Sequence, residues 1–497
     1  MEKVIVNSTR SCNPASLAGN LAQLHPLLSK AAMQAAHTNR AVLASLILPI
    51  SESNPLQIFR AMHRLHPGAC FYWEQPARQT AFVGTGTALS IQTSGSRHFA
   101  DAALAWQALR DEALVFHVAD EAEGASHALD GPALFSGFSF DPLRPATSLW
   151  QDFPDGLLIL PSLLFRQHKE QTILALNYLV QPTDNLDNLM NTLTQEITRF
   201  SELLATLPDS SLNLPEETQA YKLRDVLPVN DWKKLIDHTV HLIQEGSYAK
   251  VVLARAVEVT MDEYQPSFSL TRTLQRLRQS YPAAYIFAFQ RGERTFVGAT
   301  PERLVYAQDG QLHTMALAGS ASRGASQSED RLLGSALLAS PKNRAEHEFV
   351  TTMLRASLDH LCSKIWIADT PELLRLKNIQ HLQTALIGEL LPNRNILEAL
   401  HILHPTPAVG GTPTEAALRF IREHEHLDRG WYAGPIGWID LHGNGEFAVA
   451  LRSAILERRR ATLFAGCGIV KDSNPEAEYL ESRLKLQVMW RSLSGEE

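Results

Sequence analysis

The chain has 497 residues, of which 45% are hydrophobic and 20% are charged, and its formal net charge at pH 7 is -8. A chain of this length can bury the core of one large domain or of two. The acidic balance argues against a nucleic-acid partner, because nucleic-acid-binding domains usually present a basic surface.

Cysteine spacing and apolar runs indicate where the protein resides. The four cysteines stand far apart, at Cys12, Cys70, Cys362 and Cys467. This spacing predicts neither a zinc site nor a disulfide framework and is typical of a reducing cytoplasm. The N-terminal residues lack the apolar core of a signal peptide. The longest apolar run, Ala41–Ile50, is about half the length of a membrane span. We therefore expect a cytoplasmic protein with no membrane partner, and a core strand over this run.

The first 225 residues predict an α+β part that carries no recognisable chemical motif. Strands are expected at Ala41–Ile50, Cys70–Glu74, Thr80–Val83 and Leu157–Leu164, and helices at Ala102–Leu114 and Asn188–Leu207. Pro208–Val229 is polar, contains proline and is weakly periodic, which favours a linker. We therefore divide the chain into residues 1–225, which complete the sheets, and residues 226–497, which carry the candidate chemistry.

The second part predicts helices and strands in a more regular order. Asn230 is expected to cap a helix that ends just before Gly246. Ser340 and Pro341 suit the cap and first turn of a long helix, and a last helix begins near Asn474–Pro475. The apolar face of the long helix is expected to consist of Phe349, Val350, Met353 and Leu354. The expected strands are Val251–Met261, Ala283–Gln290, Thr295–Thr300, Arg303–Gln308, Leu312–Ala318, Trp431–Asp440, Glu446–Leu456 and Thr462–Val470. Short turns between several of these strands predict antiparallel pairing.

A lysine and a glutamate stand at the ends of two of these strands. Lys250 begins the segment KVVLARAVEV, and Glu302 follows the segment TFVGAT. We expect the two side chains to be delivered from two strand ends of one sheet. A reaction in which one group takes a proton while another gives one needs such a pair.

Further charged residues lie on the two late helices. Glu346 lies in the first turns of the helix that begins at Pro341, and Glu478, Glu481 and Lys485 share one face of the last helix. Two helices that each direct a glutamate inward can hold one hard cation, and Mg²⁺ prefers few protein carboxylates together with an anionic substrate. The same spacing also suits a solvated helix surface, so the spacing alone leaves both interpretations open.

Four other segments are candidates for a binding site. His381 sits among apolar neighbours, where either a hydrogen-bonded core residue or a catalytic group fits. The segment HPTPAVGG, from His404, is either a plain turn or a rigid pocket wall. Gly466 and Gly468 end a strand before the last helix and allow backbone N–H groups to face an anion. Arg452 offers a planar fork for a carboxylate, or it lies on the surface of the adjacent strand.

These residues fall within motifs that resemble those of the chorismate-utilising enzymes. The motifs, in order, are KVVLAR, GATPERL, ALAGS, AEHEFV, QHLQT, HPTPAVGG, YAGPIGW, LRSA, AGCGIV and PEAEYLESRLK, between Val229 and Ser494. The family includes isochorismate synthase, salicylate synthase, and the first components of anthranilate synthase and aminodeoxychorismate synthase. The resemblance implies an α+β fold in which two large antiparallel β-sheets pack face to face and are flanked by helices, with the site between the sheets.

The resemblance also implies a Mg²⁺ site and a chorismate site. Glu346 and Glu481 match the metal ligands, and Glu478 matches an acidic residue that reaches the metal through water. The metal holds the ring carboxylate of chorismate, as do Lys485 and the backbone near Gly466 and Gly468. Arg452 and Tyr432 match residues that hold the enolpyruvyl side. The full set implied to bind substrate is Gly319, Ala408, Tyr432, Arg452, Gly466, Gly468 and Lys485.

Three positions separate the members of this family. Lys250 matches the base that activates water, where members that use ammonia typically carry glutamine. Ala318 replaces the lysine nucleophile of aminodeoxychorismate synthase. Ala408 matches isochorismate synthases, whereas salicylate synthases tend to have threonine there. Cys467, where alanine is usual, is a conservative departure. The resemblance therefore implies an isochorismate synthase, with salicylate synthase and a non-catalytic chorismate-binding protein as the alternatives.

The implied reaction adds water at C2 of chorismate and removes the C4 hydroxyl to give isochorismate. Lys250 is expected to act as the general base in its neutral form, and Glu302 as the general acid in its protonated form. His381 is expected to orient Glu302 or the hydroxyl. The product is expected to feed menaquinone, siderophore or salicylate biosynthesis, and no glutamine amidotransferase subunit is expected.

Overall fold

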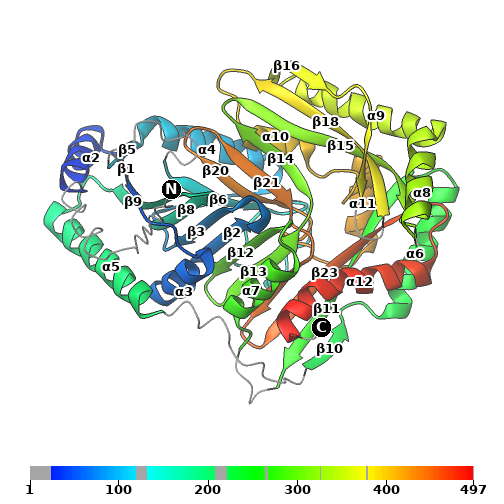
Figure 1. Ribbon diagram of the computed structural model, residues 1–497, viewed down its shortest axis with the longest axis horizontal. Coiled ribbons are helices and arrows are strands. Elements are labelled where there is room, and N and C mark those ends of the chain that lie inside the picture. The colour runs from blue at the N-terminus through cyan, green and yellow to red at the C-terminus, as the bar shows by residue number, and fades with distance from the viewer. Residues whose placement is uncertain are drawn as a thin grey trace, which may run out of the picture.

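A computed structural model describes residues 24–118, 131–207, 221–262, 267–324, 326–375 and 379–495. These residues form two large β-sheets surrounded by helices (Figure 1). In spatial order, the larger sheet contains β10 (Tyr221–Asp225), β11 (Lys250–Met261), β23 (Arg460–Ile469), β22 (Ser453–Glu457), β13 (Arg294–Thr300), β12 (Tyr285–Arg291), β2 (Cys70–Gln75), β3 (Thr80–Thr85), β8 (Leu163–His168), β9 (Gln171–Val180), β1 (Val42–Pro49) and β5 (Leu114–His117). The short strand β19 (Gly411–Thr412) pairs with β11.

The smaller sheet is built in the same way from strands that are distant in sequence. Its spatial order is β16 (Cys362–Ile367), β18 (Ile379–Leu390), β15 (Gln311–Ser322), β14 (Arg303–Gln308), β21 (Gly445–Val449), β20 (Pro435–Asp440), β6 (Ala133–Phe138), β7 (Gly156–Leu160) and β4 (Leu89–Thr93), with β17 (Glu372–Arg375) beside β18. Both sheets therefore combine strands from before and after residue 225.

The α-helices are α2 (Leu24–Thr38), α3 (Pro55–Leu65), α4 (His98–Glu112), α5 (Leu186–Thr206), α6 (Val229–Gln244), α7 (Leu270–Ser280), α8 (Gln327–Ala339), α9 (Pro341–Leu358), α10 (Ile396–Leu403), α11 (Thr414–His424) and α12 (Pro475–Ser494). Among the described helices, none has a stretch apolar and long enough to cross a membrane.

Strand pairing is antiparallel through both sheets, as the short turns predicted, with one difference at an edge. There, β1 and β5 run parallel. The chain between them is long and contains α3, β2, β3, β4 and α4, which gives the length of connection that parallel strands need.

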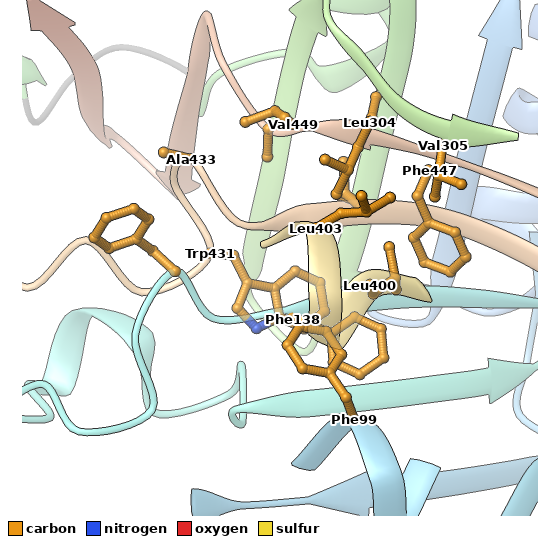
Figure 2. Packing of buried hydrophobic residues seen from close by; sticks show 14 of the residues in the cluster. Phe99, Phe138, Leu304, Val305, Leu400, Leu403, Trp431, Ala433, Phe447 and Val449 are labelled. Carbon is orange, nitrogen blue, oxygen red and sulfur yellow. The ribbon is translucent and has the colours of Figure 1, made fainter. Parts of the chain in front are cut away.

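The two sheets pack face to face through aromatic side chains. Phe71 of the larger sheet stacks on Phe135 of the smaller one, with ring centroids 5.5 Å apart. Phe82 and Trp438 meet in the same way at 4.3 Å. Figure 2 shows a neighbouring part of this core, where side chains from α4, α10, β6, β14 and β21 gather around Phe138. Each fully buried side chain of this size contributes about 1.5–3 kcal/mol.

A second apolar cluster covers the other face of the larger sheet. It contains Leu28 of α2, Phe59 of α3, Phe200 of α5, Leu274 of α7 and Met489 of α12, all buried. These helices therefore shield the sheet from solvent on the side away from the smaller sheet (Figure 1).

Two segments that were expected to be single strands each divide between the sheets. Leu157–Leu164 forms the end of β7 in the smaller sheet and the start of β8 in the larger one, separated by Pro161. Proline lacks an N–H for the ladder, so it stands where the chain changes sheet. Glu446–Leu456 likewise divides into β21 and β22. Arg452 therefore lies in the bend between two strands rather than on a strand, and its φ is +48°.

Helix ends follow the expectations in part. The Ser340 hydroxyl caps α9 by accepting the Asn343 N–H at 3.3 Å, as predicted. Asn230 lies inside α6, whose cap position is Pro228, so the prediction of Asn230 as the cap is wrong.

Two further expectations are wrong in part. On α9, Phe349 and Met353 are exposed by 59% and 55%, so the predicted apolar face does not face the core at these positions. In the expected linker, residues 208–220 lie outside the described part, and Tyr221–Asp225 forms β10, which pairs with β11.

Candidate functional site

Lys250 begins β11 and lies directly over a glycine of the neighbouring strand. In the ladder, Val252 pairs with Gly468 of β23, and Lys250 pairs with Thr412 of β19. A Cβ placed on Gly468 would come within 2.6 Å of Lys250 Cε and 3.3 Å of Lys250 Nζ. The lysine side chain therefore occupies the space that any other residue at 468 would fill.

Glu302 lies where the chain leaves β13 in the larger sheet and enters β14 in the smaller one. Its backbone carbonyl accepts the Val449 N–H at 3.0 Å. The Thr300 hydroxyl donates to the Val449 carbonyl at 2.6 Å and accepts the Glu302 N–H at 3.3 Å. These bonds fix the backbone of Glu302 at the crossing between the sheets.

Burial and nearby charges shift the pKa values of Lys250 and Glu302 in opposite directions. Burial lowers the pKa of Lys250, and the positive charge of Lys485 lowers it further, while Glu302, Glu346 and Glu481 raise it. Burial raises the pKa of Glu302, and the charges of Lys250 and Lys485 partly offset this effect. The structure thus brings these five predicted residues into one electrostatic cluster. Within it, the lysine is moved toward its neutral form and the glutamate toward its protonated form, as the sequence interpretation required.

His381 comes from the smaller sheet and reaches the same cluster. It lies on β18 opposite a bulge in β15, where the register shifts between Ala318 and Ser320. Gly319 forms this bulge with φ +72°, a conformation that favours glycine. Burial lowers the pKa of His381, as does the charge of Lys250, while a hydrogen bond with the Gly319 backbone raises it. The lowered pKa favours a neutral imidazole near the lysine.

Tyr432 and Arg452 form another wall. Tyr432 is buried and stacks on Phe464 with ring centroids 5.2 Å apart. A Cβ on Gly466 would stand 3.1 Å from the Tyr432 hydroxyl, so Gly466 leaves room for that group. Burial lowers the pKa of Arg452, although the negative charges of Glu481 and Glu302 act to raise it. The charges of one predicted metal ligand and of the predicted acid therefore both act on this guanidinium.

Helix α12 contributes two carboxylates and a lysine. Lys485 Nζ lies 2.6 Å from Glu481 Oε1 and donates to the Gly466 carbonyl at 2.8 Å. Glu478 Oε1 accepts the Ser473 hydroxyl at 2.7 Å, and burial raises the pKa of Glu478. The helix face that the spacing predicted is thus turned toward β23 rather than entirely toward solvent.

Two glutamates of α12 suit a hard divalent cation, whereas the Cys467 thiol beside them is a soft donor that does not. Ligand atoms of Cys467, Glu478 and Glu481 lie within 4.8 Å of one another. Glu346 lies outside this three-residue group, on α9, where it is exposed yet close enough for its charge to act on Lys250. Carboxylate oxygens with room for water are the ligands that Mg²⁺ takes, so the glutamates suit this ion.

The loop that contains Ala408 packs against the start of β11. The Val252 N–H donates to the Gly410 carbonyl at 3.0 Å. A Cβ on Gly411, whose φ is +138°, would stand 2.4 Å from the Lys250 carbonyl oxygen. His404 Nε2 donates to the Phe140 carbonyl at 3.0 Å, and burial lowers the pKa of His404 to about 4. The segment is therefore a fixed wall beside Lys250 rather than a plain turn.

Sequence reasoning missed three residues near this cluster. Cys467 was regarded only as a conservative replacement, although its thiol lies beside two glutamates and burial raises its pKa to about 12. Glu425 and Arg429 were not singled out, and they form a buried ion pair against β11. The signal available in the sequence was an Arg four residues after a Glu, and it is a weak one.

A separate hollow of about 400 Å³ lies away from this cluster, with Asn54, Glu74, Gln167 and Arg278 among its lining residues. It contains none of the predicted site residues. Its walls come from β2, β3, β8, α7 and the turn before α3.

Comparison with known proteins agrees with the motifs. A family model described as chorismate binding enzyme matches residues 29–494. Isochorismate synthase MenF of Bacillus subtilis is 37% identical over 465 residues, which are 93% of this chain and 96% of that protein. The salicylate biosynthesis isochorismate synthase of Pseudomonas aeruginosa is 38% identical over 483 residues, 97% of this chain and 96% of that protein.

Solved structures agree as well. The menaquinone-specific isochorismate synthase MenF from Escherichia coli superposes with a TM-score of 0.72 at 26% identity, covering 96% of this chain and 100% of that one. Anthranilate synthase component I from Streptococcus pneumoniae, at 21% identity and a TM-score of 0.63, shares the fold. The predicted fold class and the predicted family are both confirmed. The chain belongs to the family of chorismate binding enzymes.

Proposed function

We propose that this protein is an isochorismate synthase that adds water at C2 of chorismate and removes the C4 hydroxyl. One observation carries the proposal: Lys250 and Glu302 share one cluster, with the pKa of the lysine lowered and that of the glutamate raised. The names of the two relatives that match nearly the whole chain support the same activity. The name of the Pseudomonas relative points to salicylate biosynthesis, and that of the Escherichia coli structure is menaquinone-specific, so we propose that the product serves one of these or a siderophore pathway.

Lys250 takes the proton of the attacking water, because a neutral amine can accept a proton and an ammonium cannot. Glu302 gives a proton to the departing hydroxyl, since hydroxide alone is a poor leaving group. Each such transfer is worth about a hundred- to ten-thousandfold in rate. His381, neutral and bonded to the Gly319 backbone, orients the acid or the hydroxyl from the side of the smaller sheet.

The carboxylates of Glu346, Glu481 and Glu478 would hold Mg²⁺, with Glu478 acting through water. When bound, the ion cancels the charge of the substrate carboxylate and fixes its position. Lys485 and the backbone around Gly466 and Gly468 bind the same carboxylate, and the bonds of Lys485 to Glu481 and to the Gly466 carbonyl support this role. Arg452 and Tyr432 hold the enolpyruvyl group, and Gly319 and Ala408 shape the remaining walls.

The thiols support a cytoplasmic setting. The described cysteines Cys70, Cys362 and Cys467 are free and buried. Free thiols are typical of a reducing compartment, so we place the reaction in the cytoplasm.

The test is a product assay with chorismate and Mg²⁺, resolved by chromatography. Isochorismate as the main product supports the proposal. Salicylate with pyruvate as the product would instead identify a salicylate synthase. Anthranilate formed from added ammonia would exclude the proposed activity. Chorismate binding without turnover would indicate a non-catalytic chorismate-binding protein.

A further inference from the structure

The outer edge of β11, just after Lys250, is completed by side chains instead of by a strand. β19 pairs with Lys250 and Val251, and β10 pairs with β11 only from Val257 onward. Between these two strands, the Val252 carbonyl accepts Arg429 Nη2 at 2.7 Å. The Ala254 N–H donates to Glu425 Oε2 at 2.7 Å. Glu425 and Arg429 therefore stand in for the missing length of neighbouring strand.

Arg429 also bonds the loop that contains Ala408 and the turn that contains Tyr432. Its Nη1 donates to the Val409 carbonyl at 3.0 Å, one residue after Ala408. Its own backbone carbonyl accepts the Tyr432 N–H at 2.8 Å. The guanidinium and the backbone carbonyl of Arg429 thus join three segments: the strand of Lys250, the loop of Ala408 and the turn that contains Tyr432.

The pair is almost completely removed from water. Glu425 and Arg429 are exposed by 1% and 2%, and Arg429 Nε donates to Glu425 Oε1 at 2.6 Å. The guanidinium also lies over the Phe140 ring, 4.3 Å from its centroid. Apolar side chains of similar volume usually stabilise a core as well as a buried ion pair does. What apolar groups cannot supply is the set of directed bonds to Val252, Ala254 and Val409.

We propose that Glu425 and Arg429 are positioning residues that set the separation between Lys250 and the segments of Ala408 and Tyr432. The proposal rests on the proposed function, since it assumes that Lys250 acts on a substrate bound by those segments. If the start of β11 shifts with respect to the loop of Ala408, the Lys250 amine moves away from Gly468. It also moves away from the charges of the proposed site. That displacement alters both the reach of Lys250 toward the substrate and the pH at which it is neutral.

The experiment compares Arg429→Lys with the wild type and with Arg278→Lys. Lysine keeps the charge but cannot bond the Val252 and Val409 carbonyls together, because it lacks the planar fork. Arg278 is a matched control, since it pairs with Glu74 at 2.6 Å on the helix-covered side of the larger sheet. For Arg429→Lys we expect kcat to fall about 10- to 100-fold, as for a misplaced catalytic group. We also expect at least one limb of the pH profile of kcat/KM to shift, and faster amide hydrogen exchange at residues 252–254.

Arg278→Lys is expected to leave kcat, the pH limbs and exchange at residues 252–254 as in the wild type. If the Glu425–Arg429 pair is purely structural, Arg429→Lys and Arg278→Lys should both have a lower melting temperature, and the limbs of both pH profiles should stay in place. That result would overturn the inference. If Arg429→Lys does not fold, Glu425→Gln takes its place, because its amide oxygen can still accept the Ala254 N–H. An unmoved pH limb and unchanged kcat in Glu425→Gln would then count against the inference. A wild type that makes no isochorismate removes the proposed function itself, which is a separate outcome.

Discussion

Lys250 lies across Gly468, and its Cε would be only 2.6 Å from any Cβ at that position. We predict that Gly468→Ala lowers kcat by about a hundredfold, because the lysine must leave its place to make room. The overpacked site should also cost about 1–3 kcal/mol of stability. Steady-state kinetics together with a thermal melt separate the two effects. Wild-type kcat in a folded variant would show that Lys250 does not need this position.

Replacing the proposed base tests its role directly. Lys250→Ala should abolish turnover while chorismate still binds, because the metal ligands, Lys485 and Arg452 remain. Product chromatography measures the first part of this prediction, and calorimetric titration with chorismate measures the second. Unchanged turnover would exclude Lys250 as the base.

The opposite pKa shifts of Lys250 and Glu302 predict a specific pH dependence. The active form needs a neutral lysine and a protonated glutamate, so kcat/KM of the wild type should be bell-shaped, with limbs that belong to the pair. Glu302→Gln removes the group that loses activity when it ionises. The residual rate should therefore be about a hundred- to ten-thousandfold lower and should rise with pH to a plateau as Lys250 loses its proton. A residual profile that falls as pH rises would contradict this assignment.

Removal of divalent ions should stop the reaction reversibly. Chelation with EDTA is expected to abolish turnover, and added Mg²⁺ should restore it. Glu481→Gln should raise the Mg²⁺ concentration needed for half-maximal rate, since it removes one anionic ligand next to Lys485. Glu476→Gln is a suitable control, because Glu476 lies on the same helix as Glu481, pairs with Lys233 of α6 and is not among the proposed ligands. Full activity in the presence of EDTA would remove the metal from the mechanism.

Much of the fold could be predicted from local patterns. Strands such as β1, β2 and β13 and the caps of α9 and α12 follow from apolar runs and from Ser340 and Asn474. The division of Leu157–Leu164 could not be predicted in this way, because both halves are apolar and the sheet that each half joins depends on distant strands. The exposure of Phe349 and Met353 on α9 is likewise decided by what packs against the helix, which helical periodicity does not report.

The residues of the candidate site also fall into two groups, those that local motifs predict and those that only distant contacts reveal. The motifs supplied Lys250, Glu302, Glu346, Glu481 and Lys485, and the structure brings their charges together. Arg429 bonds a carbonyl 177 residues away in sequence, so no local pattern reveals it. Cys467 was noticed only as a substitution, because its closeness to Glu478 and Glu481 depends on how α12 lies along β23.

The points where the polypeptide passes from one sheet to the other include Pro161, Glu302 and Arg452. Glu302 and Arg452 are residues of the proposed site, so that site lies where the chain crosses between the sheets. β12 also needs β2 as its neighbour, and β20 needs β6. A fragment that begins at residue 226 would leave both of those edges bare and prone to self-association. The N-terminal residues thus complete both sheets around the proposed site, although they contribute none of the proposed reacting groups.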